Sequence, residues 1–283
     1  MPFDGHSRAM HLAGLYIYPV KSLRGFAVPV AEIDALGLAG DRRFLVIDAA
    51  GKFLTQRQNA RMALVDTALA NGRLTLSAEG AGRVTVPTAP DPAAPLRTVT
   101  VWRSEGLQAE DCGDAAAEWL GGFLHLTCRL VRIGAQFHRP VLKKAGRPGD
   151  TFSFADGAPI LVTSEASLAA LNDRIQENQG EPVPMDRFRP NLVLAGGEAF
   201  AEDLAPALRI GAVTLRNAGR SDRCIITTTD QRTGERGKEP LRTLATFRRD
   251  PVEPTAVYFG ANYINESKSG TVRVGAAVEV PAP

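Results

Sequence analysis

Residues 219–229 read Gly-Arg-Ser-Asp-Arg-Cys-Ile-Ile-Thr-Thr-Thr. Polar residues that suit a turn come first, and the β-branched run from Ile225 to Thr229 predicts a strand directly after Cys224. A thiol beside the Arg223 guanidinium, where a loop enters a strand, favours the thiolate form that attacks substrates or binds metals. Cys224 is therefore a candidate nucleophile or metal ligand, although a lone cysteine in a β-rich chain is more often a small buried hydrophobic residue.

Short strands separated by turns make up most of the chain. Apolar and β-branched runs predict strands at residues 12–20, 44–47, 52–54, 74–76, 83–86, 98–102, 160–163, 192–194, 213–215, 257–259, 271–274 and 278–280. Apolar residues at helical spacing predict helices at residues 114–124, after the capping residue Ser164, and around residues 241–247. The fold class is therefore predicted to be mainly β (α+β), with a β-rich N-terminal half.

The composition is that of an ordinary soluble globular protein. The chain has 283 residues, of which 44% are hydrophobic and 23% charged, and this length is enough for two domains. The 33 basic and 31 acidic residues give a formal net charge of +2. This near balance argues against a general binder of nucleic acid or another polyanion, so any positive site must be local.

The cysteines, Cys112, Cys128 and Cys224, are odd in number and widely spaced, without a C-x-x-C pair. The pattern supports neither a disulfide framework nor a zinc ribbon, and it fits a reducing compartment. The thiols are also too few for an all-cysteine iron–sulfur cluster, so electrons for a redox reaction would come from another protein.

Residues 1–10 are polar and contain neither a signal-peptide core nor a spanning helix. The protein is predicted to be cytoplasmic, with no membrane anchor.

Two charged segments of the N-terminal half adjoin predicted strands. Residues 18–22, Tyr-Pro-Val-Lys-Ser, end a strand with Lys21 and Ser22. Residues 40–44, Gly-Asp-Arg-Arg-Phe, place Arg42 just before another strand. A solvated lysine and a surface ion pair are the ordinary interpretations, so each segment by itself is a weak indication of function.

Two segments of the C-terminal half suit an anion. Thr163 and Ser164 stand at the N-terminus of a predicted helix, where free N–H groups and hydroxyls suit a phosphate, although ordinary capping gives the same pattern. Residues 187–191, Arg-Phe-Arg-Pro-Asn, offer the Arg189 fork for phosphate oxygens and the Asn191 amide for a heterocycle edge, unless they form a basic loop without a ligand. The polar segment 137–156 either borders a site or joins two elements.

Taken together, these segments resemble the MOSC family, in the architecture that places a β-rich N-terminal domain before a MOSC domain, as in the mitochondrial amidoxime-reducing components and their bacterial relatives. The matching stretches follow the family's order over nearly the whole chain: residues 18–22, 41–42, 111–117, 164–168, 188–191, 223–228, 238–241 and 270–275. The resemblance implies a first domain at residues 10–125 and a MOSC β-barrel with peripheral helices at residues 126–281. The site would then lie in a groove between them.

The resemblance also implies a molybdenum cofactor (Mo-molybdopterin), a pyranopterin whose dithiolene holds the metal. Cys224 would be the catalytic residue and the protein's own ligand to molybdenum, because a soft sulfur donor suits this redox metal. Cys112 and Cys128 keep the interpretation of buried hydrophobic residues. The residues implied to hold the phosphate and pterin of the cofactor are Lys21, Ser22, Arg42, Thr163, Ser164, Arg189, Asn191 and Arg223.

The implied reaction is the two-electron reduction of small N-hydroxylated substrates, such as amidoximes and hydroxylamines, with the N-bound oxygen leaving as water. A separate electron-donor protein, an iron–sulfur or flavin reductase, is expected, because the chain ends at Pro283 just after its last predicted strand. Thr228 and Asp230 are candidate contributors to proton delivery, although Asp230 more readily forms a turn. The alternative function is a carrier of the cofactor, or a sulfur carrier with a persulfide on Cys224, because MOSC domains also occur on cofactor sulfurases.

Overall fold

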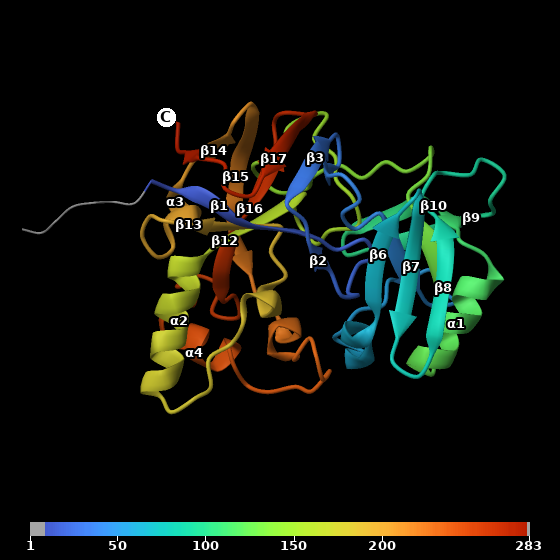
Figure 1. Ribbon diagram of the computed structural model, residues 1–283, viewed down its shortest axis with the longest axis horizontal. Helices are drawn as coiled ribbons and strands as arrows, with labels where there is room; N and C mark the ends of the chain where they lie inside the picture. The colour runs from blue at the N-terminus through green and yellow to red at the C-terminus, as the bar shows by residue number, and fades with distance from the viewer. Residues whose placement is uncertain (1–8, 282–283) are drawn as a thin grey trace, which may run out of the picture.

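A computed structural model describes residues 9–281, which form two lobes built mainly of strands (Figure 1). Within this range an eight-stranded sheet organises the larger lobe, in the order β18 (Val278–Glu279), β14 (Ala207–Ile210), β15 (Val213–Asp222), β16 (Tyr258–Asn265), β12 (Ile160–Ser164), β13 (Leu192–Ala195), β1 (His11–Ile17) and β2 (Phe26–Ala27). A second sheet of this lobe contains β17 (Gly270–Arg273), β3 (Val30–Asp34) and β4 (Gly37–Leu38). The prediction of a mainly β fold is confirmed.

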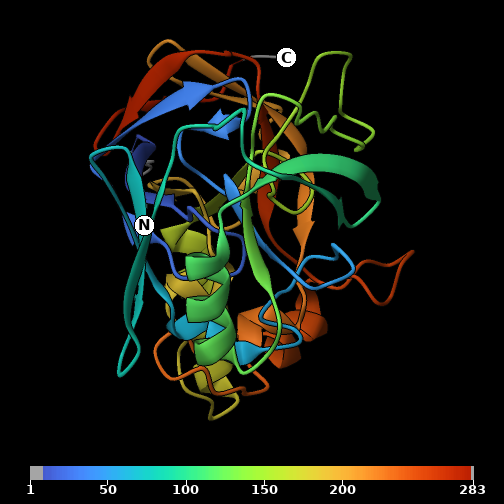
Figure 2. The same cartoon turned by 90° about the vertical axis from the view of Figure 1, so that its right-hand side faces the viewer.

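The smaller lobe contains the remaining strands of the described chain. One sheet has the order β5 (Phe44–Ile47), β11 (Arg129–Arg132), β10 (Ser104–Asp111) and β9 (Leu96–Val101), and the other is β6 (Asp66–Ala70), β7 (Arg73–Ala78) and β8 (Gly82–Pro87). Helix α1 (Asp114–Leu124) packs against β8 and β11 and faces the viewer in Figure 2. The short 3₁₀ helix η1 (Ala60–Leu64) precedes β6. The predicted helix at residues 114–124 is therefore confirmed.

The other helices belong to the larger lobe. They are α2 (Glu165–Glu177), α3 (Ala201–Leu204), α4 (Leu241–Phe247), and the 3₁₀ helices η2 (Met185–Phe188) and η3 (Ile225–Thr228). The hydroxyl of Ser164 accepts a hydrogen bond from the Ser167 backbone N–H at 3.1 Å, which confirms Ser164 as the cap of α2. Leu171 and Ile175 bury the inner face of this helix, as their spacing predicts.

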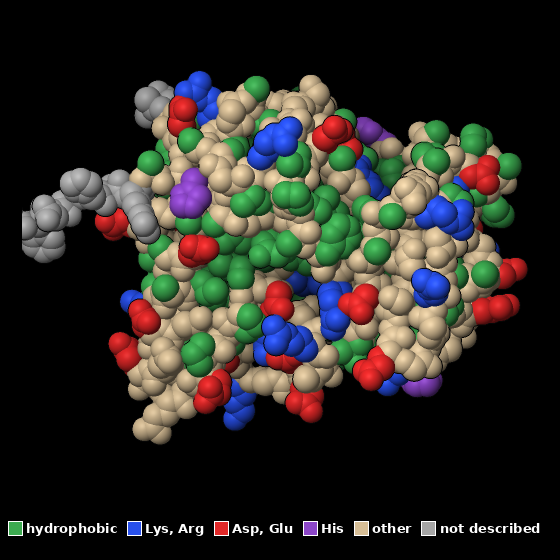
Figure 3. Space-filling view, in the orientation of Figure 1, with side chains coloured by type: hydrophobic (Ala, Val, Ile, Leu, Met, Phe, Trp, Pro, Cys, Tyr) green, Lys and Arg blue, Asp and Glu red, His purple; other side chains and the backbone are tan. Residues whose placement is uncertain are grey.

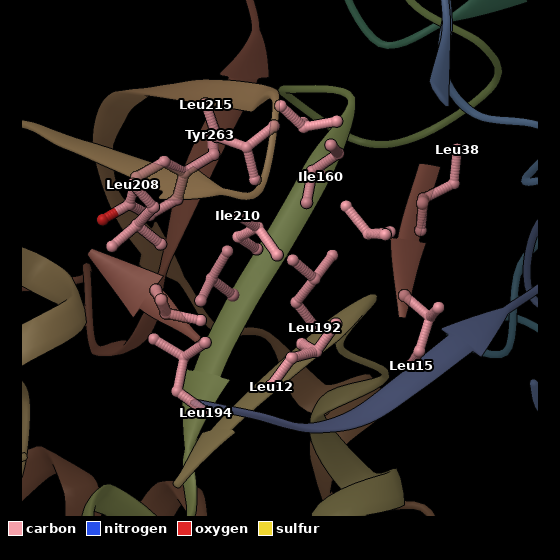
Figure 4. Packing of buried hydrophobic residues seen from close by; sticks show 14 of the residues in the cluster. Leu12, Leu15, Leu38, Ile160, Leu192, Leu194, Leu208, Ile210, Leu215 and Tyr263 are labelled. Atoms are coloured by element: carbon pink, nitrogen blue, oxygen red, sulfur yellow. The ribbon is translucent and has the colours of Figure 1, made fainter. Parts of the chain in front are cut away.

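The core of the larger lobe follows from the alternation of side chains along its strands. Ile160 and Val162 of β12, and Leu208 and Ile210 of β14, are two residues apart and point into the same buried cluster. Leu12 and Leu15 of β1 complete it from the other end of the chain (Figure 4). The N-terminal strand is therefore part of the core of the C-terminal lobe.

The two ends of the chain are interlocked by strand pairing. Strand β1 pairs antiparallel with β13, and β3 pairs antiparallel with β17. In the other direction, β11 follows residue 125 but lies between β5 and β10 of the smaller lobe. The division into residues 10–125 and 126–281 stays a prediction, and the sheets exchange strands across it in both directions.

The strand predicted directly after Cys224 is wrong. Residues Ile225–Thr228 form η3, and the strand before it, β15, continues to Asp222, through the residues expected to form a turn. Thr227 Oγ1 and Thr228 Oγ1 donate hydrogen bonds to the carbonyl oxygens three residues earlier, at 3.0 and 2.8 Å. These local bonds satisfy a tight helical turn, and they override the preference of β-branched residues for strands.

Candidate functional site

A pocket of about 1010 Å³ lies where the two lobes meet, and it is called the interlobe pocket below. Its lining comes from four parts of the chain: residues 21–57, 102–104, 139–161, and 188–262. Seven of the residues predicted to bind the cofactor or its metal line it, namely Lys21, Ser22, Arg42, Arg189, Asn191, Arg223 and Cys224. The sequence therefore singled out residues that are far apart in the chain and close together in the structure.

Three of these seven residues hold a strained backbone. Ser22, Arg42 and Arg189 have φ angles of 67°, 47° and 53°, in the left-handed region that non-glycine residues rarely adopt. Each such residue costs on the order of 1 kcal/mol, and such residues cluster where a site needs a fixed side-chain direction. The hydrogen bonds from Lys21 N–H to the Phe44 carbonyl at 3.0 Å and from Arg42 N–H to the Tyr18 carbonyl at 2.7 Å hold the turns in place.

Two arginines that are far apart in the sequence meet at one aromatic ring. The guanidinium carbons of Arg42 and Arg189 each lie 4.4 Å from the ring centre of Tyr18. Arg42 Nη1 donates to Asp41 Oδ2 at 2.8 Å, whereas Arg189 Nη2 donates to the Leu23 carbonyl at 2.6 Å and has no carboxylate partner within residues 9–281. Burial lowers the pKa of Arg189 to about 10; Tyr18 opposes this shift and the nearby Arg42 adds to it. An anion in the pocket would supply the missing counter-charge.

Asn191 has its hydrogen bonds satisfied inside the protein. Its Oδ1 accepts from Arg42 Nη1 at 2.9 Å and from the Leu161 N–H at 3.2 Å, and its Nδ2 donates to the Tyr16 carbonyl at 3.2 Å. This side chain therefore positions Arg42 and anchors strands β1 and β12 together. The heterocycle contact expected from the sequence would have to compete with these bonds.

Lys21 and Asp156 form the pocket's principal ion pair. Lys21 Nζ donates to Asp156 Oδ1 at 2.6 Å and to the Phe154 carbonyl at 2.8 Å, and Trp102 Nε1 donates to the same carboxylate oxygen at 2.8 Å. Burial lowers the pKa of Lys21 to about 8, and the charge of Asp156 opposes this shift. Lys21 is almost fully buried, whereas the Asp156 side chain is open to the pocket.

Cys224 lies at the start of η3 and lines the pocket with its thiol. Arg57 Nη2 is 3.1 Å from its Sγ. The neighbouring Arg223 is held by Nη2 donating to the Phe188 carbonyl at 2.7 Å and Nη1 donating to Ser221 Oγ at 3.0 Å, while its buried Nε has no partner in the described chain. Burial lowers the pKa of Arg223, and the neighbouring Cys224 opposes this shift. The thiol of Cys224 therefore contacts the guanidinium of Arg57, and Arg223 directly precedes it in the chain.

Thr163 and Ser164 are not part of the lining of this pocket. Thr163 Oγ1 donates to Met185 Sδ at 3.3 Å, and Ser164 Oγ donates to Glu202 Oε2 at 3.0 Å. Ser167 Oγ donates to the other oxygen of Glu202 at 2.7 Å. The N-terminus of α2 is thus occupied by a carboxylate of the protein itself, which takes the place that a phosphate was predicted to fill.

Several lining residues were not singled out by the sequence. They are Arg57, Trp102, Arg103, Arg139, Lys143, Lys144, Asp156, Ser221 and Asp222. The one available signal was the polar segment 137–156, which does border the site and contributes four of these residues. Arg139 is the most important of the lining residues that the sequence did not indicate. Its buried guanidinium donates to the carbonyls of Ser153 and Ala155 at 2.8 and 2.6 Å and so shapes this segment.

The other candidates from the sequence have structural positions. Cys112 and Cys128 pack in or against the core of the smaller lobe, and burial raises their pKa values to about 12 and about 11. Asp230 Oδ1 accepts hydrogen bonds from the N–H groups of Arg232 and Thr233 at 2.8 and 3.0 Å, which is the turn that the sequence suggested. These residues therefore leave Cys224 as the thiol of the pocket.

Two family profiles cover most of the chain. "MOSC N-terminal beta barrel domain" matches residues 9–127, and "MOSC domain" matches residues 149–279. The chain belongs to the MOSC family. This MOSC protein is 37% identical to mitochondrial amidoxime-reducing component 1 of Mus musculus, over 93% of this chain and 80% of the relative. It is 38% identical to the same component of Homo sapiens (93% and 81%), and 36% identical to mitochondrial amidoxime reducing component 2 of Bos taurus (92% and 80%).

The predicted cytoplasmic location is wrong, because these relatives are named mitochondrial components. The cysteine pattern indicates a reducing environment, and that property alone does not identify a compartment. Within residues 9–281, no helix combines the length and the apolar character needed to cross a bilayer.

Proposed function

We propose that this MOSC protein is a molybdenum-cofactor-dependent oxidoreductase that reduces N-hydroxylated compounds such as amidoximes. The relatives named amidoxime-reducing components, at 36–38% identity over most of the chain, confirm the enzyme class predicted from the sequence. The observation that carries the proposal in the structure is the placement of Cys224 in a deep pocket rich in cations.

The charges of the interlobe pocket fit the cofactor. Of the described residues that line it, nine are lysines or arginines and two are aspartates, although the whole chain has a net charge of only +2. Elsewhere basic and acidic side chains are interspersed, as on the described part of the face in Figure 3. A phosphate and a dithiolene are both anionic. Within residues 9–281 Arg189 has no carboxylate partner and the Nε of Arg223 has no hydrogen-bond partner, so both can receive an anion. The positive site is therefore local, and it suits an anionic ligand.

Each of these residues has a task in this proposal. Cys224 supplies the protein's thiolate to molybdenum, and Lys21, Ser22, Arg42, Arg189 and Arg223 hold the anionic parts of the cofactor. The bound cofactor supplies the two-electron chemistry that breaks the N–O bond of the substrate. Asn191 holds the guanidinium of Arg42 in its direction. Thr163 and Ser164, which are engaged with Met185 and Glu202, have no part in cofactor binding here.

A separate protein delivers the electrons in this proposal. Arg103 and Lys144 line the mouth of the pocket, are exposed, and have no hydrogen-bond or ion-pair partner in the described range 9–281. Leu142 and Trp102 expose apolar surface beside them. A positive rim with apolar groups suits transient contact with an acidic iron–sulfur or flavin protein, because electrostatic steering speeds the encounter.

The test is the molybdenum and pterin content per chain, measured by mass spectrometry after expression in a host that makes the cofactor. We expect about one molybdenum per wild-type chain and a marked loss in Cys224→Ser, whereas the matched control Cys112→Ser, away from the pocket, keeps the wild-type content. Turnover of an amidoxime with a chemical reductant should follow the metal content. Wild-type protein that takes up neither metal nor pterin would contradict the proposal and direct attention to a persulfide on Cys224.

A further inference from the structure

A side chain of the smaller lobe reaches the thiol of Cys224. Arg57 and Cys224 are 167 residues apart in the chain, yet Arg57 Nη2 lies 3.1 Å from Cys224 Sγ. We propose that Arg57 is a positioning residue that donates an N–H···S hydrogen bond to the molybdenum-bound sulfur and thereby raises the reduction potential of the metal. The inference rests on the proposed function, because it requires molybdenum on Cys224.

Arg57 is held in this direction by contacts along its whole length. Its guanidinium carbon lies 4.5 Å from the ring centre of Trp102, so the planar group stacks on the indole. Its backbone N–H donates to the buried hydroxyl of Thr55 at 3.1 Å, and its carbonyl accepts from Arg236 Nη2 at 2.9 Å. Arg236 comes from the segment after η3, so both lobes fix the backbone of Arg57. A loosely held surface arginine would have none of these anchors.

Trp102 is itself fixed in the position in which its ring contacts Arg57. It sits in the turn between β9 and β10 with φ at 57°, and 44% of its surface is exposed. Its Nε1 donates to Asp156 at 2.8 Å, and its ring lies 5.2 Å from that of Phe53. A half-exposed tryptophan with a strained backbone lowers the stability of the fold. This conformation allows its contacts with Arg57 and Asp156. The chain of contacts runs from Lys21 through Asp156 and Trp102 to Arg57 and Cys224.

The direction of the effect follows from the charge on sulfur. A hydrogen bond from a cation draws electron density from a thiolate ligand, so the sulfur donates less to the metal. The electron-rich reduced state of the metal is then favoured over the oxidised state, as hydrogen bonds to ligand sulfurs do in other redox centres. Removal of the donor should therefore lower the reduction potential.

The experiment compares the molybdenum-loaded wild type with Arg57→Met and Arg103→Met. Both variants lose one positive charge at the same pocket, but only Arg57 contacts Cys224 Sγ. Molybdenum content and a potentiometric titration of the bound metal are measured for each protein. We expect a lower potential in Arg57→Met than in Arg103→Met, which should stay close to wild type, and a change in kcat larger than the change in KM for the amidoxime.

A second variant keeps the inference testable if Arg57→Met is poorly folded. Trp102→Leu leaves the donor but removes its stacking partner, so it should lower the potential in the same direction by a smaller amount. Equal potentials in wild type, Arg57→Met and Trp102→Leu, with molybdenum retained, would overturn the role of Arg57 and leave the proposed function intact. If Arg57→Met loses its metal, the potential of Trp102→Leu decides: a potential below that of the wild type supports the role of Arg57, and an equal one overturns it. Wild-type protein without molybdenum would overturn both.

Discussion

Lys21 shows at the scale of one residue that a buried charge in the interlobe pocket costs stability. The residue is 4% exposed, and burial disfavours its charge more than the Asp156 carboxylate compensates. The pKa of Lys21 therefore falls from 10.5 to about 8. Below about pH 8 the amine is protonated in both the folded and the unfolded state, and the folded protein bears the full cost of this buried charge. Between about pH 8 and 10.5 the folded state has released the proton while the unfolded chain still holds it, so this cost to stability shrinks as the pH rises.

Lys21→Met should therefore stabilise the cofactor-free protein at neutral pH. We expect an increase in the free energy of unfolding of about 1–2 kcal/mol at pH 7, because Asp156 is open to solvent and tolerates the loss of its partner. The gain should shrink as the pH rises from about 8 to about 10.5, where the wild-type amine becomes neutral in the folded state. Urea unfolding at pH 7 and pH 10 measures both effects. A clear destabilisation at pH 7 would contradict this account, and the same variant should lose molybdenum when expressed with the cofactor.

At the scale of elements, the N-terminus of α2 and the turn after β1 are predicted to behave in opposite ways. Ser164→Ala removes the helix cap and one donor to the buried Glu202 carboxylate, so it should cost about 1–2 kcal/mol of stability. It should leave the molybdenum content unchanged, because Ser164 is outside the interlobe pocket.

Ser22→Ala is the matched comparison, since the same atom is removed from a residue that lines the pocket. No hydrogen bond of its hydroxyl to residues 9–281 holds the fold, so we expect a small change in stability and a loss of molybdenum. Urea unfolding and metal analysis of both variants distinguish the two roles. If fully folded Ser164→Ala lost metal, this result would support the phosphate site that the sequence predicted at the N-terminus of α2.

The elements also show what local sequence can and cannot predict. Helix α1 and the cap of α2 depend on neighbours a few residues away, and both were predicted correctly. The segment after Cys224 was not, because its threonine hydroxyls bond to carbonyls within η3 and outweigh strand preference. The anion at α2 was missed for another reason. Glu202 lies 38 residues from Ser164, and only the fold brings its carboxylate to the helix.

At the scale of the whole molecule, the chain should not separate into independent folding units at residue 125. Residues 126–281 lack β1 and its side chains Leu12, Leu15 and Ile17, which belong to the core of the larger lobe. A fragment of these residues would leave an open edge at β13 and a cavity in that core. We expect no cooperative urea transition from the fragment alone, and recovery of one when residues 1–125 are co-expressed. A cooperative transition of the isolated fragment would contradict the interlocked arrangement.

The same interlocking explains which part of the site the sequence could indicate. Lys21, Arg42, Arg189 and Cys224 stand in short motifs that mark them individually. Arg57 and Arg139 stand in no such motif, and only the meeting of the lobes brings them to the pocket. The fold class and the cofactor could therefore be predicted from motifs, whereas the arginine that contacts the thiol could not.

The positive rim of the pocket predicts how charge affects electron delivery. Arg103 and Lys144 are exposed at the mouth, so an anionic reductant such as dithionite should reduce the molybdenum-loaded protein more slowly as ionic strength rises from about 0.02 to about 0.5 M, where the screening length falls from about 20 to about 4 Å. Reduced methyl viologen, a cation, should react faster over the same range.

The double variant Arg103→Glu/Lys144→Glu should weaken or reverse both trends in stopped-flow measurements. Arg73→Glu/Arg83→Glu is the matched control, because it changes the net charge equally at exposed residues of the smaller lobe outside the pocket. If the control shifts the rates as much as the rim variant does, the net charge of the molecule governs the encounter rather than the rim. A difference between the two variants locates the approach of these reductants at the mouth of the interlobe pocket.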